Sequence, residues 1–197
     1  IPGSIKVNLK KMISRKKAVV DQTISGIDFL MKKNNISVYN GLGSFIDSTH
    51  INIEGEKKII IEAKNTIIAT GSKPSSLPFI SLDKERIITS TEALELKEIP
   101  KHLIIIGGGV IGLELGQVYK RLGAEVSVIE YADRITSLMD SSLSRELMKV
   151  LKKQKINFYL SHKVNNVQRK GKNIKVTATD KNDNEVYFEG DYCLVSV

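Results

Sequence analysis

Residues 103–116 read Leu-Ile-Ile-Ile-Gly-Gly-Gly-Val-Ile-Gly-Leu-Glu-Leu-Gly. The run 103–106 is short and wholly apolar, which is typical of a parallel strand buried on both faces. Gly107, Gly109 and Gly112 follow with the spacing G-x-G-x-x-G. In such a unit the first glycine permits a tight turn, the second lets the backbone approach phosphates, and the third lets the helix pack on the strand. The stretch therefore predicts a strand, a phosphate-binding turn and a helix.

The residues that follow support this interpretation. Four apolar residues recur at helical spacing after the turn: Ile111, Leu115, Val118 and Leu122. Gly123 stands where a helix C-cap belongs, and residues 126–129 are a second apolar strand that ends at Glu130. A carboxylate at that place can accept hydrogen bonds from the adenosine ribose of a dinucleotide. We therefore expect an adenine dinucleotide with its pyrophosphate at the helix N-terminus.

The acid at the end of the second strand also favours one cofactor. A carboxylate at Glu130 suits ribose hydroxyls and repels a 2′-phosphate, so NAD is favoured over NADP. Residues 131–133 supply no cation, and Arg134 reads as part of a solvated turn.

Composition excludes several other classes of protein. The chain has 197 residues, of which 41% are hydrophobic, and no apolar run long enough for a membrane span. Its net charge of +8 includes a basic cluster over residues 6–17. Aromatic residues are only 6% of the chain and Trp is absent, so a solvated lysine-rich helix face is favoured over a nucleic-acid surface. The single cysteine, Cys193, excludes a disulfide scaffold, indicates a reducing compartment and reads as a buried apolar residue rather than a nucleophile.

The first part of the chain predicts a long helix and several strands. Apolar spacing indicates a helix over residues 6–34, followed by a strand at 36–39 that leads into a Gly41-Leu42-Gly43 turn. Residues 51–53 and 59–61 read as a hairpin with Gly55 in its turn. Residues 65–69 read as a further strand that runs into Thr70 and Gly71.

The later part alternates and then changes character. Thr89 and Glu92 fit a capping box that opens a short helix over 93–96. Residues 140–154 read as an amphipathic helix with Leu143, Leu147, Val150 and Leu151 on its inner side. Short strands follow at 157–160, 164–169, 174–179, 185–189 and 192–197. Because the chain begins with Ile1 and ends inside an apolar strand, we expect it to be a piece of a longer protein.

Taken together, these motifs resemble the pyridine nucleotide-disulfide oxidoreductase family, and within it the dihydrolipoyl dehydrogenases. The resemblance covers essentially the whole chain, in order. It is carried by the basic helix, the Gly41-Leu42-Gly43 turn, and residues 65–72, 90–94, 107–116 and 191–195. It implies an α/β fold: a doubly wound, Rossmann-like NAD-binding domain with a β-meander crossover over residues 80–197, preceded by part of an FAD-binding domain over residues 1–79.

The resemblance also implies roles for individual residues. Those matching the NAD site are Gly107, Gly108, Gly109, Val110, Ile111, Gly112, Leu113, Glu114, Glu130 and Val164, the last through its backbone beside the adenine. Those matching the FAD site are Gly43, Ala69, Thr70, Gly71 and Ser72. Glu114 matches an acid that pairs with a lysine beside the reactive face of the flavin, and no residue of this chain matches a redox cysteine pair or an acid–base His-Glu couple.

The implied complete enzyme oxidises dihydrolipoamide on 2-oxo acid dehydrogenase complexes, through an enzyme disulfide and FAD, and reduces NAD to NADH. It would be a homodimer in the mitochondrial matrix, or in the cytoplasm of a bacterium. The isolated chain is expected to be inactive. Two alternatives stay open: a glutathione reductase, mercuric reductase or NADH oxidase type of relative, and a non-catalytic dinucleotide-binding module.

Overall fold

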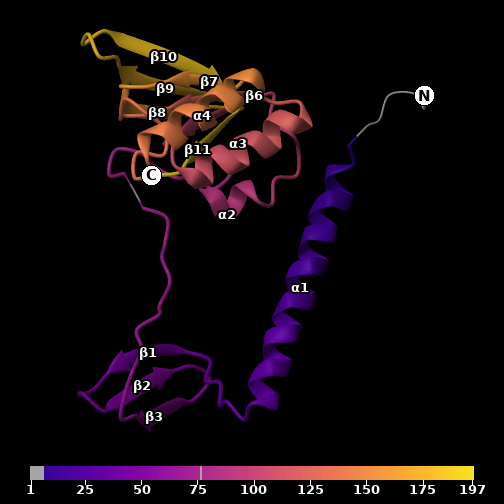
Figure 1. Cartoon of the computed structure of the whole chain (residues 1–197), viewed down its shortest axis with the longest axis vertical. Helices are drawn as coiled ribbons and strands as arrows, with labels where there is room; N and C mark the ends of the chain where they lie inside the picture. Colours follow the sequence, from indigo (N-terminus) through magenta and orange to yellow (C-terminus); the bar gives the residue numbers. More distant parts are fainter. Residues whose placement is uncertain (1–6, 76) are drawn as a thin grey trace. The chain divides into compact units, whose positions relative to one another are not determined.

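The computed structural model describes residues 7–75 and 77–197, and these form two compact units (Figure 1). One unit is Ser14–Ser72, and the other contains Lys73–Val197. Each unit has its own secondary structure.

The first unit combines most of a long helix, from Ser14 onward, with a small antiparallel sheet. Helix α1 is Leu9–Lys33, close to the predicted span, and all of its residues are at least partly exposed. Strands β1 (Leu42–Phe45), β2 (His50–Glu54) and β3 (Lys58–Glu62) pair in the order β1-β2-β3. The predicted hairpin is confirmed as β2 and β3, which pair antiparallel on either side of Gly55.

Two other strand predictions in this unit were wrong. Residues 36–39 are irregular, and the predicted turn at Leu42 and Gly43 is instead the start of β1. Residues 65–69 are irregular as well, and Ile67 and Ile68 are 91% and 73% exposed. Apolar β-branched side chains favour a strand only where a neighbouring strand completes the ladder and covers them, and among the described residues these segments have no such neighbour.

The second unit is built on a parallel sheet with the strand order β4-β11-β5-β6-β7. Its strands are β4 (Ile87–Ile88), β5 (His102–Ile106), β6 (Glu125–Ile129), β7 (Asn157–Tyr159) and β11 (Tyr192–Val195). Its helices are α2 (Ser90–Ala93), α3 (Val110–Leu122) and α4 (Ser141–Lys153). A separate antiparallel meander contains β8 (Lys163–Lys170), β9 (Asn173–Thr179) and β10 (Glu185–Gly190).

The parallel sheet is buried on both faces, which explains the apolar run in the sequence. Leu103 and Ile105 of β5 belong to the core that includes the helix residues Leu113 and Leu151. Their neighbours on β5, such as Ile104, belong to a second core shared with the meander strands β8 and β9. The predicted α/β fold with a parallel sheet is therefore confirmed, with helices packed on one face and the β-meander on the other (Figure 1).

The helix ends follow the sequence signals. Thr89 caps α2, and its capping box with Glu92 is formed, although the helix ends at Ala93 rather than at Leu96. Gly123 ends α3 in the left-handed conformation with φ 107°. The buried face of α3 includes Leu113, Gly116 and Tyr119, and the Tyr119 hydroxyl donates a hydrogen bond to the carbonyl of Ala93.

Periodicity identified the buried faces of α3 and α4 only in part. On α3, Ile111 and Val118 are 54% and 43% exposed. On α4, two of the four predicted inner residues, Leu143 and Val150, are 61% and 51% exposed. The inner side of α4 contains the predicted Leu147 and Leu151, together with Ser144 and Met148, which were not predicted. The predicted and the observed inner residues of α4 both recur at helical spacing, so periodicity alone does not distinguish them. Packing against the sheet determines which set is buried.

This assignment can be tested with two leucines of the same helix. Replacing Leu151, which is fully buried, with alanine leaves a cavity and should cost about 2–5 kcal/mol of unfolding free energy. The matched change Leu143→Ala on the exposed side should cost within about 0.5 kcal/mol. Urea unfolding of both variants measures the difference, and equal losses would contradict this assignment of the buried face.

Candidate functional site

The glycine-rich turn after β5 is packed tightly at its first and last glycines. Gly107 has φ 105°, and its N–H donates to the carbonyl of Ile129 at 2.9 Å. A Cβ at Gly107 would lie 2.6 Å from the carbonyl oxygen of Ser196, and one at Gly112 would lie 2.5 Å from the Ser196 hydroxyl. Both positions therefore exclude any larger residue, as the motif predicts.

The middle glycine is different, because space beside it is open. Gly109 is the N-cap of α3 with φ −76°, and apart from its neighbours along the chain none of the described residues places a heavy atom within 4 Å of a Cβ built there. The first hydrogen bond of α3 runs from the N–H of Leu113 to the carbonyl of Gly109. The backbone N–H groups of Val110, Ile111 and Gly112 precede that bond, so this end of the helix could bind an anion through them and through the positive end of the helix dipole.

Glu130 lies directly beside this turn. Its Oε2 accepts a hydrogen bond from the N–H of Gly108 at 2.5 Å, and its Oε1 accepts one from the N–H of Ala132 at 2.7 Å. Each carboxylate oxygen has a second lone pair, which leaves acceptor capacity for a ligand hydroxyl. The structure thus brings the predicted ribose acceptor to the predicted phosphate turn.

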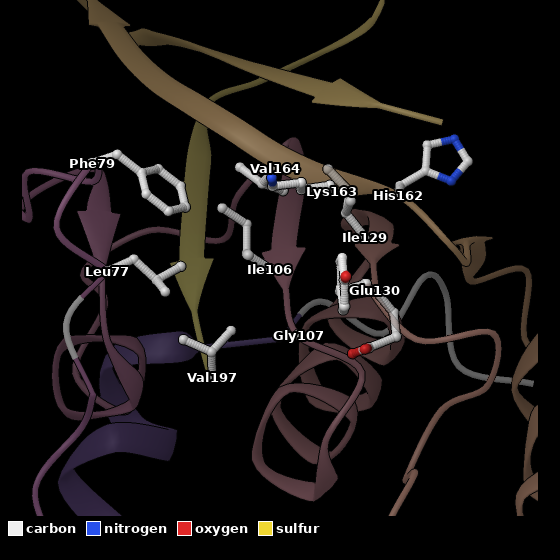
Figure 2. A pocket seen from close by; sticks show the side chains of 11 residues that line it. Leu77, Phe79, Ile106, Gly107, Ile129, Glu130, His162, Lys163, Val164 and Val197 are labelled. Atoms are coloured by element: carbon white, nitrogen blue, oxygen red, sulfur yellow. The ribbon is translucent and has the colours of Figure 1, made fainter. Parts of the chain in front are cut away.

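A pocket of about 260 Å³ opens at the carboxyl ends of β5 and β6 (Figure 2). Three predicted site residues line it together: Gly107, Glu130 and Val164. Most of the other lining side chains are apolar: Leu77, Phe79, Ile106, Ile129 and Val197. Figure 2 shows Glu130 at one end and Phe79 at the other. An apolar slot with a carboxylate at one end suits a flat heteroaromatic ring joined to a hydroxylated sugar.

The other predicted NAD residues do not line this pocket. Leu113 is only 2% exposed and packs in the helix-side core, so its side chain does not line the pocket. Glu114 is exposed on α3. Gly108 is buried and donates its backbone N–H to Glu130.

Sequence reasoning did not predict most of the residues that line this pocket. Lys163 and Val197 follow from topology, because the ends of neighbouring elements meet at one edge of a sheet. Leu77 and Phe79 lie before β4, in a segment with no periodic pattern that could have indicated them.

His162 also lines the pocket, but Figure 2 shows its imidazole pointing away from the other side chains. Its Nδ1 lies 2.7 Å from the carbonyl of Leu160, and its ring packs edge-on near Tyr159 and Phe188. These contacts account for the imidazole without a ligand.

The predicted FAD residues lie in the first unit. Gly43, Ala69 and Thr70 line one pocket of about 300 Å³ with apolar residues that include Phe45 and Ile67. Gly71, with φ 73°, and Ser72 follow that pocket in the chain without lining it. The structure therefore brings three of the five predicted residues together.

Cys193 lies in the middle of β11 and is fully buried. It pairs with Ile87 of β4 and Ile104 of β5. Burial raises the pKa of its thiol far above the usual range, and the charge of Asp83 adds to the effect. Among the described residues, no group of three or more His, Cys, Asp or Glu side chains is arranged to hold a metal ion.

Comparison with known proteins identifies relatives along the whole chain. The family described as pyridine nucleotide-disulphide oxidoreductase matches residues 4–197. Over 99% of its length, the chain is 39% identical to the mitochondrial dihydrolipoyl dehydrogenase of Schizosaccharomyces pombe and 41% identical to the dihydrolipoyl dehydrogenase of Bacillus subtilis. It covers only 39% and 42% of those two proteins.

Solved structures agree with the sequence relatives. The crystal structure of LpdA from Mycobacterium tuberculosis matches 99% of the chain with a TM-score of 0.84 and 27% identity, and the match spans 43% of LpdA. The Cu(II) complex of a mutant of the flavoprotein disulfide reductase RclA from Escherichia coli matches 95% of the chain with a TM-score of 0.82, over 42% of its own length. At 24% identity, the RclA match shows the shared fold alone.

The burial of Cys193 makes a direct prediction about its reactivity. Because the thiolate is the reactive form and burial disfavours it, the folded chain should not react with a thiol reagent such as DTNB over an hour at pH 8. The same chain in denaturant should release one equivalent of coloured product within minutes. Rapid labelling of the folded chain, checked as folded by circular dichroism, would contradict the buried placement.

Proposed function

Because the chain belongs to the pyridine nucleotide-disulphide oxidoreductase family, we propose that it binds NAD and is a segment of a dihydrolipoyl dehydrogenase. Enzymes of this family use FAD and NAD. The activity assigned to the whole protein is the oxidation of dihydrolipoamide, with electrons passed through a redox disulfide and FAD to NAD. In this proposal, residues 1–79 belong to the FAD-binding domain and residues 80–197 form the NAD-binding domain.

One observation carries the proposal: the three motif glycines have different surroundings. Gly107 and Gly112 have no room for a Cβ because of Ser196, whereas space beside Gly109 is open. Contacts within the described part of the protein therefore do not explain why residue 109 is a glycine. At the N-terminus of a helix, a glycine is explained by the close approach of a ligand phosphate to the protein backbone. The residues present therefore fit an adenine dinucleotide.

Each residue then has a defined part in binding. The N–H groups at the start of α3 receive the pyrophosphate. Glu130 accepts hydrogen bonds from the ribose hydroxyls and disfavours a 2′-phosphate, and the backbone of Val164 meets the adenine edge. NAD, when bound, supplies the nicotinamide that accepts hydride, and the protein supplies position and electrostatics.

The first unit supplies part of the flavin site in this proposal. Gly43 and the segment from Ala69 to Ser72 contact FAD, and the pocket that Gly43, Ala69 and Thr70 line is open and apolar. From the second unit, Glu114 on α3 pairs with a lysine beside the flavin. The sequence contains one cysteine, whereas a redox disulfide needs two. In this proposal the chain therefore contributes the binding site for NAD, the hydride acceptor, and does not contribute the redox disulfide.

Partners and location follow from the same proposal. The complete protein would act as a homodimer on the dihydrolipoyl domains of 2-oxo acid dehydrogenase complexes. The relatives include a mitochondrial protein and a bacterial one, so we propose the mitochondrial matrix or the bacterial cytoplasm. Among the described helices, none is both long and apolar enough to cross a bilayer.

Binding of NADH tests the proposal directly. The chain should bind NADH, followed by nicotinamide fluorescence, and should bind NADPH more weakly because of Glu130. Gly109→Ala fits the protein without a clash, but its methyl group stands where the phosphates approach, so NADH affinity should fall by about tenfold or more. The control Gly26→Ala, on α1, should bind like the wild type. Failure of the folded wild-type chain to bind millimolar NADH would refute the proposed function.

A second experiment tests whether the isolated chain retains FAD or oxidises dihydrolipoamide. The purified chain should carry no stoichiometric flavin and should not oxidise dihydrolipoamide, because its flavin pocket is open and its only cysteine is buried. The visible spectrum near 450 nm and an assay of NADH formation measure these two properties. A yellow chain with one bound flavin would contradict the expectation.

A further inference from the structure

The backbone of Gly108, in the centre of the glycine-rich turn, is held from both sides. Its N–H donates to Oε2 of Glu130 at 2.5 Å, and its carbonyl accepts from the N–H of Thr136 at 2.9 Å. A Cβ at Gly108 would lie 3.1 Å from Glu130 Oε2 and 3.2 Å from Ile135 Cγ2. The absence of a side chain at Gly108 therefore lets both partners reach the turn.

A buried polar pair supports one of these partners. Thr136 is 6% exposed and Ser144, on α4, is 2% exposed. Their hydroxyl oxygens are 2.9 Å apart, and the Ser144 hydroxyl also lies 3.3 Å from the carbonyl oxygen of Thr136. The pair thus connects the loop after β6 to the first turn of α4.

Backbone strain at Thr136 indicates that this arrangement is enforced. Thr136 has φ 45°, a left-handed conformation that is unfavourable for a β-branched residue. Such strain, which costs on the order of 1–3 kcal/mol, persists only where surrounding contacts over-determine the conformation. Here the contacts are the N–H of Thr136 on Gly108 and the hydroxyl of Ser144 on Thr136.

The orientation of the Gly108 carbonyl bears directly on phosphate binding. The next residue, Gly109, is the N-cap of α3, and its N–H belongs to the same peptide group as that carbonyl. Rotation of this peptide would change the direction of the Gly109 N–H and the path by which a phosphate approaches the helix. A turn that contains three consecutive glycines has many conformations open to it, so fixing one of them in advance lowers the entropic cost of binding.

We infer that Glu130 and the Thr136–Ser144 pair are positioning residues that hold the phosphate-binding turn in its binding conformation. Glu130 then has two functions, since its carboxylate fixes the Gly108 amide in addition to accepting the ribose hydroxyls. Ser144 acts at a distance, through Thr136. This inference rests on the proposed function, because it assigns residues to the same dinucleotide site.

The first experiment compares two serines of α4, with ADP as the probe. Ser144→Ala removes the hydroxyl that anchors Thr136. Loss of one hydrogen bond that preorganises the site should weaken ADP binding by about fivefold. The control is Ser142→Ala: this serine also uses its hydroxyl, but it is exposed and donates to Asp140 Oδ1 at 2.6 Å, at the start of its own helix. Calorimetric titration of ADP and urea unfolding of both variants separate binding from stability.

The second experiment separates the two functions of Glu130. With 2′,3′-dideoxy-ADP, which has no ribose hydroxyls, Glu130 can contribute only through the Gly108 amide. Glu130→Ala should therefore still lose about fivefold in affinity for this analogue, and Glu130→Gln, which keeps an acceptor oxygen, should lose less. The Gly108 amide proton should also move upfield in the NMR spectrum of Glu130→Ala, because the short bond to the carboxylate is lost. This second variant keeps the inference testable if Ser144→Ala does not fold.

The outcomes are distinguishable. Weaker ADP binding in Ser144→Ala but not in Ser142→Ala, with weaker dideoxy-ADP binding in Glu130→Ala, supports the inference. Wild-type affinity of Ser144→Ala for ADP and of Glu130→Ala for the dideoxy analogue overturns it while the proposed function stands. If the folded wild-type chain binds neither ADP nor NADH, the proposed function fails, and the inference fails with it.

Discussion

The burial of β5 on both faces determines where the site can form. Successive residues of this strand alternate between two cores, one shared with the helices and one shared with the meander, and residues 103–106 are at most 4% exposed. Because packing on both faces fixes the strand, the position of its last residue varies little. Gly107 follows the last residue of β5, and its φ of 105° lets the chain turn toward the start of α3. The position of the helix N-terminus is therefore a consequence of core packing.

The turn itself has few side chains with which to hold its shape, so neighbouring segments hold it instead. Ser196, directly after β11, occupies the space that a Cβ at Gly107 or Gly112 would need, and Glu130, directly after β6, accepts a hydrogen bond from the N–H of Gly108. Both neighbours arrive at the same edge because parallel strands end together. The topology that supports the proposed dinucleotide site at the carboxyl ends of the strands thus also supplies the groups that define the glycine turn.

Much of the second unit could be predicted from sequence because its signals are local. The apolar run of β5, the G-x-G-x-x-G spacing, the capping box at Thr89 and the C-cap at Gly123 each depend on a few adjacent residues. The polar pair of Thr136 and Ser144 could not be predicted, since neither residue type indicates a buried contact and no motif joins them. Leu143 was assigned to the wrong face because two stripes on α4 are similarly apolar. The irregular segment at Ile67 shows the same limit, because a strand also requires a neighbour that local sequence does not reveal.

Lys163 lines the pocket although it is distant in sequence from Glu130. Its positive charge bears on the choice between NAD and NADP. Arg134, the nearest base in sequence, donates to the carbonyl of Ser137 at 2.8 Å and so belongs to its own turn. Lys163 reaches the pocket from β8, but its side chain is exposed. An ammonium in water is screened within roughly 10 Å at ordinary salt and contributes little to an ion pair. Glu130 is partly buried and fixed by two backbone amides, so its charge acts at close range in a less polar setting. The carboxylate therefore outweighs the lysine, and in the proposed NAD site we expect the balance of charge to disfavour a 2′-phosphate.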